Sequence, residues 1–94
     1  MLFRAARSGY EAIVKVLLDS GKVDVNLKNH EGETALLWAA RNRHEATVKV
    51  LLDSAKVDAN LKNNGETALL WAAYSGHEAV VKVLLDSGKV DANL

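Results

Sequence analysis

The sequence contains neither cysteine nor proline. Without cysteine, the chain has no disulfide framework, no thiol nucleophile and no thiolate metal site. A cysteine-free composition also fits a reducing compartment, so we expect an intracellular protein, either cytoplasmic or nuclear.

Long hydrophobic runs are missing as well. A typical apolar run is that of residues 35–40, whereas a membrane-spanning helix needs about 20 apolar residues. Residues 1–4, Met-Leu-Phe-Arg, reach a charge too early for a signal peptide. We therefore expect no membrane partner.

The chain also lacks an excess of charge of either sign. Twelve Lys and Arg residues balance twelve Asp and Glu residues, which argues against a polyanion partner, so no nucleic-acid binding is predicted. Lys15, Lys49 and Lys82 recur at equivalent positions, but each has a nearby Glu. This pattern favours a solvated face over a phosphate-binding one.

An internal repeat is the most informative feature that is present. Residues 35–61 and 68–94 align without gaps over 27 positions and differ at only five. Residues 1–27 align with the same block. We therefore expect a single domain over residues 1–94 with three units: 1–27, which is truncated, 28–61 and 62–94.

The spacing of the repeat changes by one residue. The segment Val-Lys-Val-Leu-Leu-Asp-Ser begins at Val14, Val48 and Val81, so the offsets are 34 and 33. The additional residue lies in connector 28–32, compared with connector 62–65. A surface turn tolerates such an insertion, whereas a packed helix does not.

Each complete unit is predicted to contain two short helices. Thr34 and Thr67 are good N-cap residues for the first helix, and a second helix is expected to begin near Glu11, Glu45 and Glu78. Such a helix pair cannot bury its own apolar face, so we expect neighbouring units to stack.

Glycine marks the break between the two helices in the outer units. Ser8-Gly9 and Ser75-Gly76 occupy this place, whereas the middle unit has Asn42-Arg43. We expect Asn42 to support the turn there, because asparagine tolerates turn conformations better than most residues.

Residues 65–73, Gly-Glu-Thr-Ala-Leu-Leu-Trp-Ala-Ala, resemble the opening Gly-x-Thr-Pro-Leu-His-x-Ala-Ala of the ankyrin repeat. Residues 76–85 resemble the second helix of that repeat, and residues 90–93 resemble its exit. The resemblance extends over essentially the whole chain. It implies a mainly α solenoid of three stacked helix-turn-helix units with turn-rich hairpin connectors.

The sequence departs from the ankyrin pattern at two positions. Ala35 and Ala68 stand where the family has proline, and Leu37 and Leu70 stand where it has histidine. Both changes remove stabilising features, namely a preset φ and a hydrogen bond between loops, so we expect the fold but not exceptional stability. The units resemble near-uniform ankyrin arrays of fungal proteins, and their likeness also fits consensus design.

Neither end of the sequence shows an obvious capping repeat. The first unit begins within its first helix, and the last unit ends without a polar outer face. We therefore expect either a piece of a longer array or an engineered minimal unit. Uncapped ends also predict end-to-end self-association.

The resemblance implies binding of a protein partner along a concave surface of turn tips and first-helix faces. Helical spacing places each first-helix Trp with the residues three and four positions later. Candidate residues on the first helices are Arg4, Arg7, Trp38, Arg41, Asn42, Trp71, Tyr74 and Ser75. Candidate residues at the turn tips are His30, Glu31, Glu33, Asn63, Asn64 and Glu66.

Two alternatives remain open for this surface. Trp38 and Trp71 can instead be half-buried framework residues, with Arg4 stacked on Trp38. The chain can also be a structural spacer within a longer array, making no partner contact of its own.

No catalytic, cofactor or metal site is predicted. His44 and His77 are equivalent residues in neighbouring units, about 10 Å apart, so they cannot both ligate one zinc ion. His30 lies in a turn. Asp19 and its equivalents recur once per unit, which does not place a paired acid and base in one cleft. We therefore expect a protein that is not an enzyme.

Overall fold

The fold is all-helical in a computed structural model that describes residues 1–92; Asn93 and Leu94, the end of the third expected unit, lie outside the described residues. The described chain contains the helices α1 (Leu2–Ser8), α2 (Glu11–Asp19), α3 (Ala35–Arg41), α4 (Glu45–Leu52), α5 (Ala68–Tyr74) and α6 (Glu78–Asp86). Within residues 1–92, β-structure is limited to an isolated bridge between Asn63 and Glu66.

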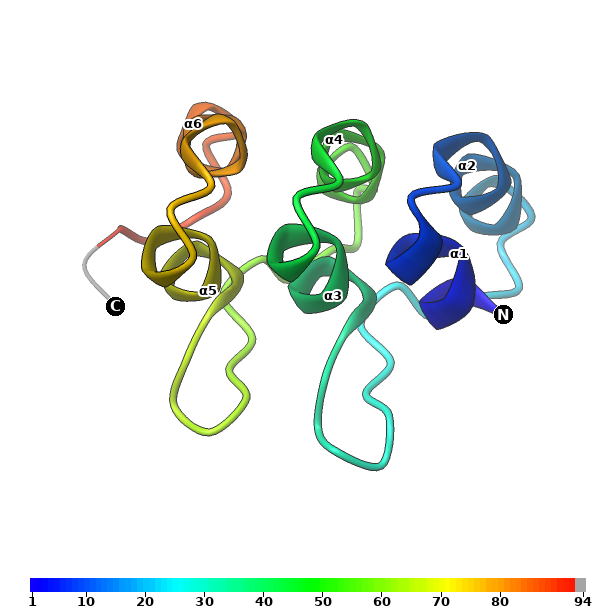
Figure 1. Cartoon of the computed structure of the whole chain (residues 1–94). Helices are drawn as coiled ribbons and strands as arrows, with labels where there is room; N and C mark the ends of the chain where they lie inside the picture. Colours follow the sequence, from blue (N-terminus) through cyan, green and yellow to red (C-terminus); the bar gives the residue numbers. More distant parts are fainter. Residues whose placement is uncertain (93–94) are drawn as a thin grey trace.

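The helices form two layers. Figure 1 shows α1, α3 and α5 side by side in one layer and α2, α4 and α6 in the other. Two hairpin-like connectors, before α3 and before α5, project from the first layer on the side away from the second layer. The predicted helical repeat solenoid of stacked helix pairs is confirmed.

The predicted caps define where the first helices begin. The Oγ1 atom of Thr34 accepts a hydrogen bond from the backbone N–H of Leu37 at 3.2 Å. Thr67 accepts from the N–H of Leu70 at 3.3 Å. Each bond satisfies a donor that has no partner within the helix. The second helices begin at the three expected glutamates, Glu11, Glu45 and Glu78.

The break between α3 and α4 differs from the expectation. Asn42 does close α3, because its Nδ2 donates to the carbonyl of Trp38 at 3.0 Å. The left-handed residue, however, is Arg43, whose φ of 60° matches the 74° of Gly9 in the first unit. The side chain of Arg43 contacts the third unit, because its Nε donates a hydrogen bond to Nδ1 of His77 at 3.3 Å.

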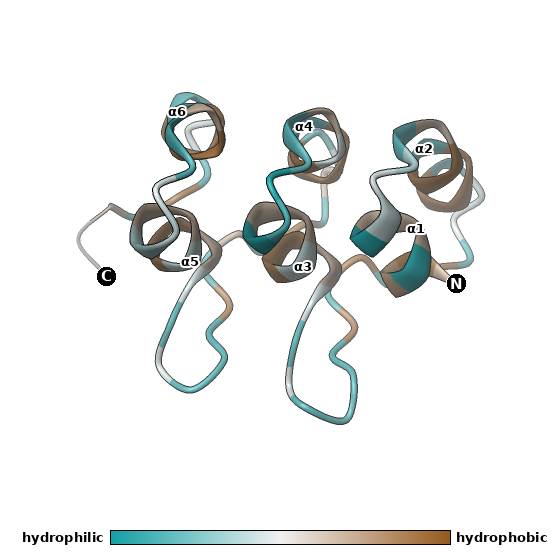
Figure 2. Ribbon diagram, in the orientation of Figure 1, coloured by the Kyte–Doolittle hydropathy of each residue, from teal (hydrophilic) through white to brown (hydrophobic). Residues whose placement is uncertain are grey.

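Alanines fill the space between the first helices. Ala6, Ala39, Ala40 and Ala72 are fully buried, and α3 packs against both α1 and α5. Small side chains at a helix contact permit a close approach of the two backbones. The second helices add larger side chains to the core, of which Leu51, Leu84, Val14, Val48 and Val80 are fully buried. Figure 2 shows hydrophilic residues along the hairpins and also on parts of α1 and of the second-layer helices.

Asparagines that the sequence analysis did not single out join neighbouring units. Nδ2 of Asn26 donates to the carbonyl of Lys56 at 2.8 Å, and its Oδ1 accepts from the N–H of Asp58 at 2.7 Å. Asn60 makes the equivalent two bonds to the third unit. The connectors are therefore held in a fixed register along the stack.

Histidines supply a second set of bonds between units. Nε2 of His44 donates to the carbonyl of Arg7 at 2.7 Å, and Nε2 of His77 donates to that of Arg41 at 3.0 Å. Each histidine thereby closes the C-terminal end of the preceding first helix. The two histidines therefore join neighbouring units.

The two hairpins differ by the inserted residue. Asn64 and Gly65, with φ of 54° and 80°, form a two-residue turn between Asn63 and Glu66, whose backbones exchange hydrogen bonds of 2.9 and 3.0 Å. Positive φ at both positions is the signature of a type I′ hairpin, for which Asn-Gly is the favoured sequence.

The longer hairpin lies between Asn29 and Glu33, whose N–H and carbonyl groups are joined at 2.9 Å. Its third loop residue, Gly32, has φ of 78°. A three-residue loop that ends on a left-handed glycine is the next common hairpin type. The repeat offset of 34 is thus explained by a change of turn type.

Thr47 provides a test of packing in the second layer. This residue is 1% exposed, and its Oγ1 has no hydrogen-bond partner among the described residues. The third unit has Val80 at the same position. We predict that Thr47→Val raises the free energy of unfolding by about 1 kcal/mol, since an unsatisfied buried hydroxyl is removed.

The matched control is Thr34→Val, which makes the same chemical change at a helix cap. This substitution should lower stability by about 1 kcal/mol, because the N–H of Leu37 loses its acceptor. Urea denaturation followed by circular dichroism measures both effects. A loss of stability for Thr47→Val would contradict the assignment of its hydroxyl as unpaired.

Candidate functional site

Arginine and tryptophan side chains alternate across the first-helix layer. The Cζ atom of Arg7 lies 5.3 Å from the ring centroid of Trp38. Arg41 lies 5.2 Å from the Trp38 ring and 5.0 Å from that of Trp71. These distances are within the range of cation–π attraction. Arg7, Trp38, Arg41 and Trp71 are called the arginine–tryptophan row below.

A buried carboxylate anchors the centre of this row. Oε2 of Glu33 lies 3.4 Å from Nη1 of Arg41, and Glu33 is only 6% exposed. Oε1 of Glu33 accepts from Nδ2 of Asn29 at 3.1 Å, and Oδ1 of Asn29 accepts the backbone N–H of Glu33 at 2.9 Å. The Arg41 guanidinium is thus held by two indoles and a fixed anion, although its side chain remains 45% exposed.

The stacking of Arg4 on Trp38, which belonged to the framework alternative, is wrong. Arg7 and Arg41 occupy that place instead. The physical reason is that Arg4 is equivalent to the tryptophans themselves and lies beside them in the stack. In the first two units, the arginine three positions later reaches across to the tryptophan of the next unit.

The remaining candidates divide by burial. Tyr74 is 72% exposed, whereas Asn63 is 9% exposed and Glu33 is buried. Glu33 and Asn63 are therefore the least accessible of the candidates. The other exposed or partly exposed candidates are Arg4, His30, Glu31, Asn42, Asn64, Glu66 and Ser75. Asn42 and Ser75 are the residues that follow α3 and α5.

Two residues that matter for this surface were not predicted. Asn29 fixes the carboxylate of Glu33, and His44 bonds the carbonyl of Arg7 at the end of α1. The recurrence of histidine at the start of the second helix was the available signal for such a role. Asn29 had no comparable signal, because its contacts depend on the shape of the hairpin.

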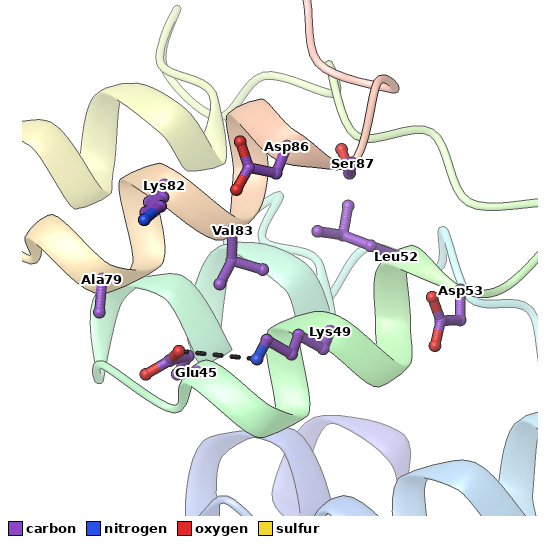
Figure 3. Close-up of a pocket in the computed structure, with 9 residues that line it drawn as sticks. All are labelled: Glu45, Lys49, Leu52, Asp53, Ala79, Lys82, Val83, Asp86 and Ser87. Atoms are coloured by element: carbon purple, nitrogen blue, oxygen red, sulfur yellow. Dashed lines mark ion pairs between the residues drawn. The ribbon is translucent and has the colours of Figure 1, made fainter.

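A groove on the other layer is a weaker candidate. It lies between α4 and α6, has a volume of about 450 Å³ and is shown in Figure 3. Charges of both signs line it, and Glu45 pairs with Lys49 at 3.7 Å. No aromatic side chain is among its lining residues. The groove thus lacks the residue types that dominate interface energetics.

The described residues show no metal centre and no membrane segment. Among residues 1–92, no three His, Cys, Asp or Glu side chains are grouped so that they could hold a metal ion. Within the same range, no helix is long and apolar enough to cross a bilayer. The arginine–tryptophan row makes the first-helix layer with its hairpins the candidate functional surface.

The sequence pattern of the ankyrin repeat, in three copies, matches residues 2–94. The chain belongs to the ankyrin repeat family. Ankyrin repeats generally mediate protein–protein interaction and are, as a rule, not enzymes. No curated protein matches the chain.

A solved structure supports the ankyrin assignment. A chain in the complex of the predatory endopeptidase Bd0816 from Bdellovibrio bacteriovorus with the immunity protein Bd3460 is 40% identical and superposes with a TM-score of 0.83. The match covers 95% of the present chain but only 46% of the other chain. The ankyrin repeats described here thus span less than half the length of that relative.

The arginine–tryptophan row gives a prediction about stability. Arg41→Gln should lower the free energy of unfolding by about 1–2 kcal/mol, because it removes two cation–π contacts and an ion pair. Thermal denaturation measures the effect. Arg4→Gln is the matched control and should change stability by less than about 0.5 kcal/mol, as is usual for surface substitutions. Equal effects of the two substitutions would contradict the assignment of Arg41 to the row.

Proposed function

We propose that the chain is a protein-interaction module that binds an intracellular partner through the concave face formed by its turn tips and first helices. The arginine–tryptophan row is the observation that carries this proposal. It joins three units into one surface and consists of the residue types that contribute most to binding at interfaces. The intracellular setting rests on the cysteine-free sequence alone.

The row is suited to binding because its central side chains are already ordered. Arg41 is held between Trp38 and Trp71 and paired with Glu33. A partner that contacts a pre-ordered side chain avoids part of the entropy loss that accompanies binding. Arg7 and Tyr74 extend the surface at either end and are exposed.

The solved relative offers independent support. Its structure was determined in a complex of an endopeptidase with an immunity protein, so a repeat chain of this kind is present in a protein–protein complex. The similarity covers 95% of the present chain and 46% of the relative.

A second candidate function is that of a structural spacer in a longer array. The observation that favours it is that Arg41 and the two tryptophans also hold neighbouring units together. In that case the row would be framework only, and the exposed face would contact nothing specific.

Affinity capture from a cell lysate tests the proposal. The test variant is Arg7→Ala, Tyr74→Ala, in which both changes are on the first-helix face at exposed residues. We expect it to lose a partner that the unmodified chain retains, with at least about tenfold weaker binding, as for the loss of contacts worth about 1.4 kcal/mol.

The matched control is Lys15→Ala, Lys82→Ala, which changes two exposed residues of the second layer and should capture the partner as the unmodified chain does. Circular dichroism must show equal helicity for all three proteins. Equal capture by the test variant would contradict binding through the concave face. If no protein is captured specifically, the spacer function is favoured.

A further inference from the structure

The second unit contains a complete site for a guanidinium group. Its anion is Glu33, its aromatic surface is Trp38, and its guanidinium is that of Arg41 from the same unit. The three residues occur at the turn, in the first helix and at the end of that helix. This arrangement serves as a template for the other units, because the units are nearly identical in sequence.

The third unit repeats the two holding groups without the cation. Glu66 is equivalent to Glu33 and Trp71 to Trp38, but Tyr74 stands in place of Arg41. Among the described residues, Glu66 has no ion-pair partner. Arg41, from the second unit, is the one described cation over the Trp71 ring.

Tyr74 does not fill the place of the missing guanidinium. Its side chain is 72% exposed, and it makes no hydrogen bond within the described residues. Glu66 is also more exposed than the buried Glu33 and is partly accessible to solvent. The third unit therefore presents an anion beside aromatic surface with a position for a cation left open.

The geometry points to Glu66, Trp71 and Tyr74 as a recognition site for an arginine side chain of a protein partner. This inference rests on the proposed function, since the site lies on the same concave face. Arginine fits because its planar guanidinium stacks on aromatic rings and donates hydrogen bonds to a carboxylate at the same time. The carboxylate of Glu66 repels phosphates and acidic side chains, which disfavours nucleic acid at this place.

The probe for this site is a short acetylated peptide, Gly-Ser-Arg-Ser-Gly, compared with the same peptide carrying neutral citrulline in place of arginine. The readout is the NMR signal of the Trp71 indole N–H, whose Nε1 is buried and has no hydrogen-bond partner within the described chain. The Trp38 indole signal is the internal reference. We expect the arginine peptide to shift the Trp71 signal saturably and the citrulline peptide to bind roughly tenfold more weakly.

Variants then test each group of the site. Tyr74→Arg should supply the guanidinium within the chain, as Arg41 does in the second unit, and abolish the response to the peptide. Glu66→Gln should weaken peptide binding about three- to tenfold. Glu31→Gln, at an exposed residue of the other hairpin, is the matched control and should bind as the unmodified chain does. All three substituted positions are at least partly exposed, so we expect each variant to fold, which circular dichroism verifies.

Three results would overturn the inference: equal binding of the two peptides, no shift of the Trp71 signal, or unaltered peptide binding by Tyr74→Arg. Its failure can be distinguished from failure of the proposed function. If Arg7→Ala, Tyr74→Ala loses the captured partner but the arginine peptide does not bind, the concave face stands and only the arginine site is wrong. If partner capture does not depend on that face, the proposed function is wrong whatever the peptide does.

Discussion

Close packing between neighbouring first helices is the constraint on which the rest of the structure depends. Buried alanines such as Ala39 and Ala72 allow α1, α3 and α5 to lie side by side. Only at this separation can Arg41 lie against its own tryptophan and against that of the next unit. A larger side chain between the helices would separate the units and open the arginine–tryptophan row.

Polar contacts between the units fix how the stack is assembled. His44 and His77 bond the last turn of the preceding first helix, while Asn26 and Asn60 bond the backbone of the following connector. Hydrogen bonds are directional, whereas hydrophobic packing is not. The apolar core therefore supplies most of the cohesion, and these polar groups determine the register in which the units meet.

The same row contributes to both framework and surface, so the two interpretations of Trp38 and Trp71 are not exclusive. A side chain that is half-buried between units is ordered by them and still offers one edge or face to solvent. The equivalent residues Arg7, Arg41 and Tyr74 are arginine in the first two units and tyrosine in the third. The glutamate and the tryptophan around this position are the same in the second and third units. Substitutions at this exposed position can therefore change the chemistry of the first-helix surface while the fold stays the same.

The sequence allowed the fold to be predicted more fully than the surface. Thr34 and Thr67 act locally, as N-caps, and their roles follow from neighbouring residues alone. The partner of Trp38 was mispredicted because it depends on the distance between units, which no local pattern contains. The left-handed Arg43 was missed for a related reason, since its backbone conformation is set by the repeat and not by its own preference.

Amide hydrogen exchange of the chain, free and with its captured partner, tests the central claim most directly. The account predicts slower exchange on binding in α1, α3, α5 and the two hairpins, with α2, α4 and α6 little changed. Protection centred on the groove between α4 and α6, with the first helices unchanged, would contradict it.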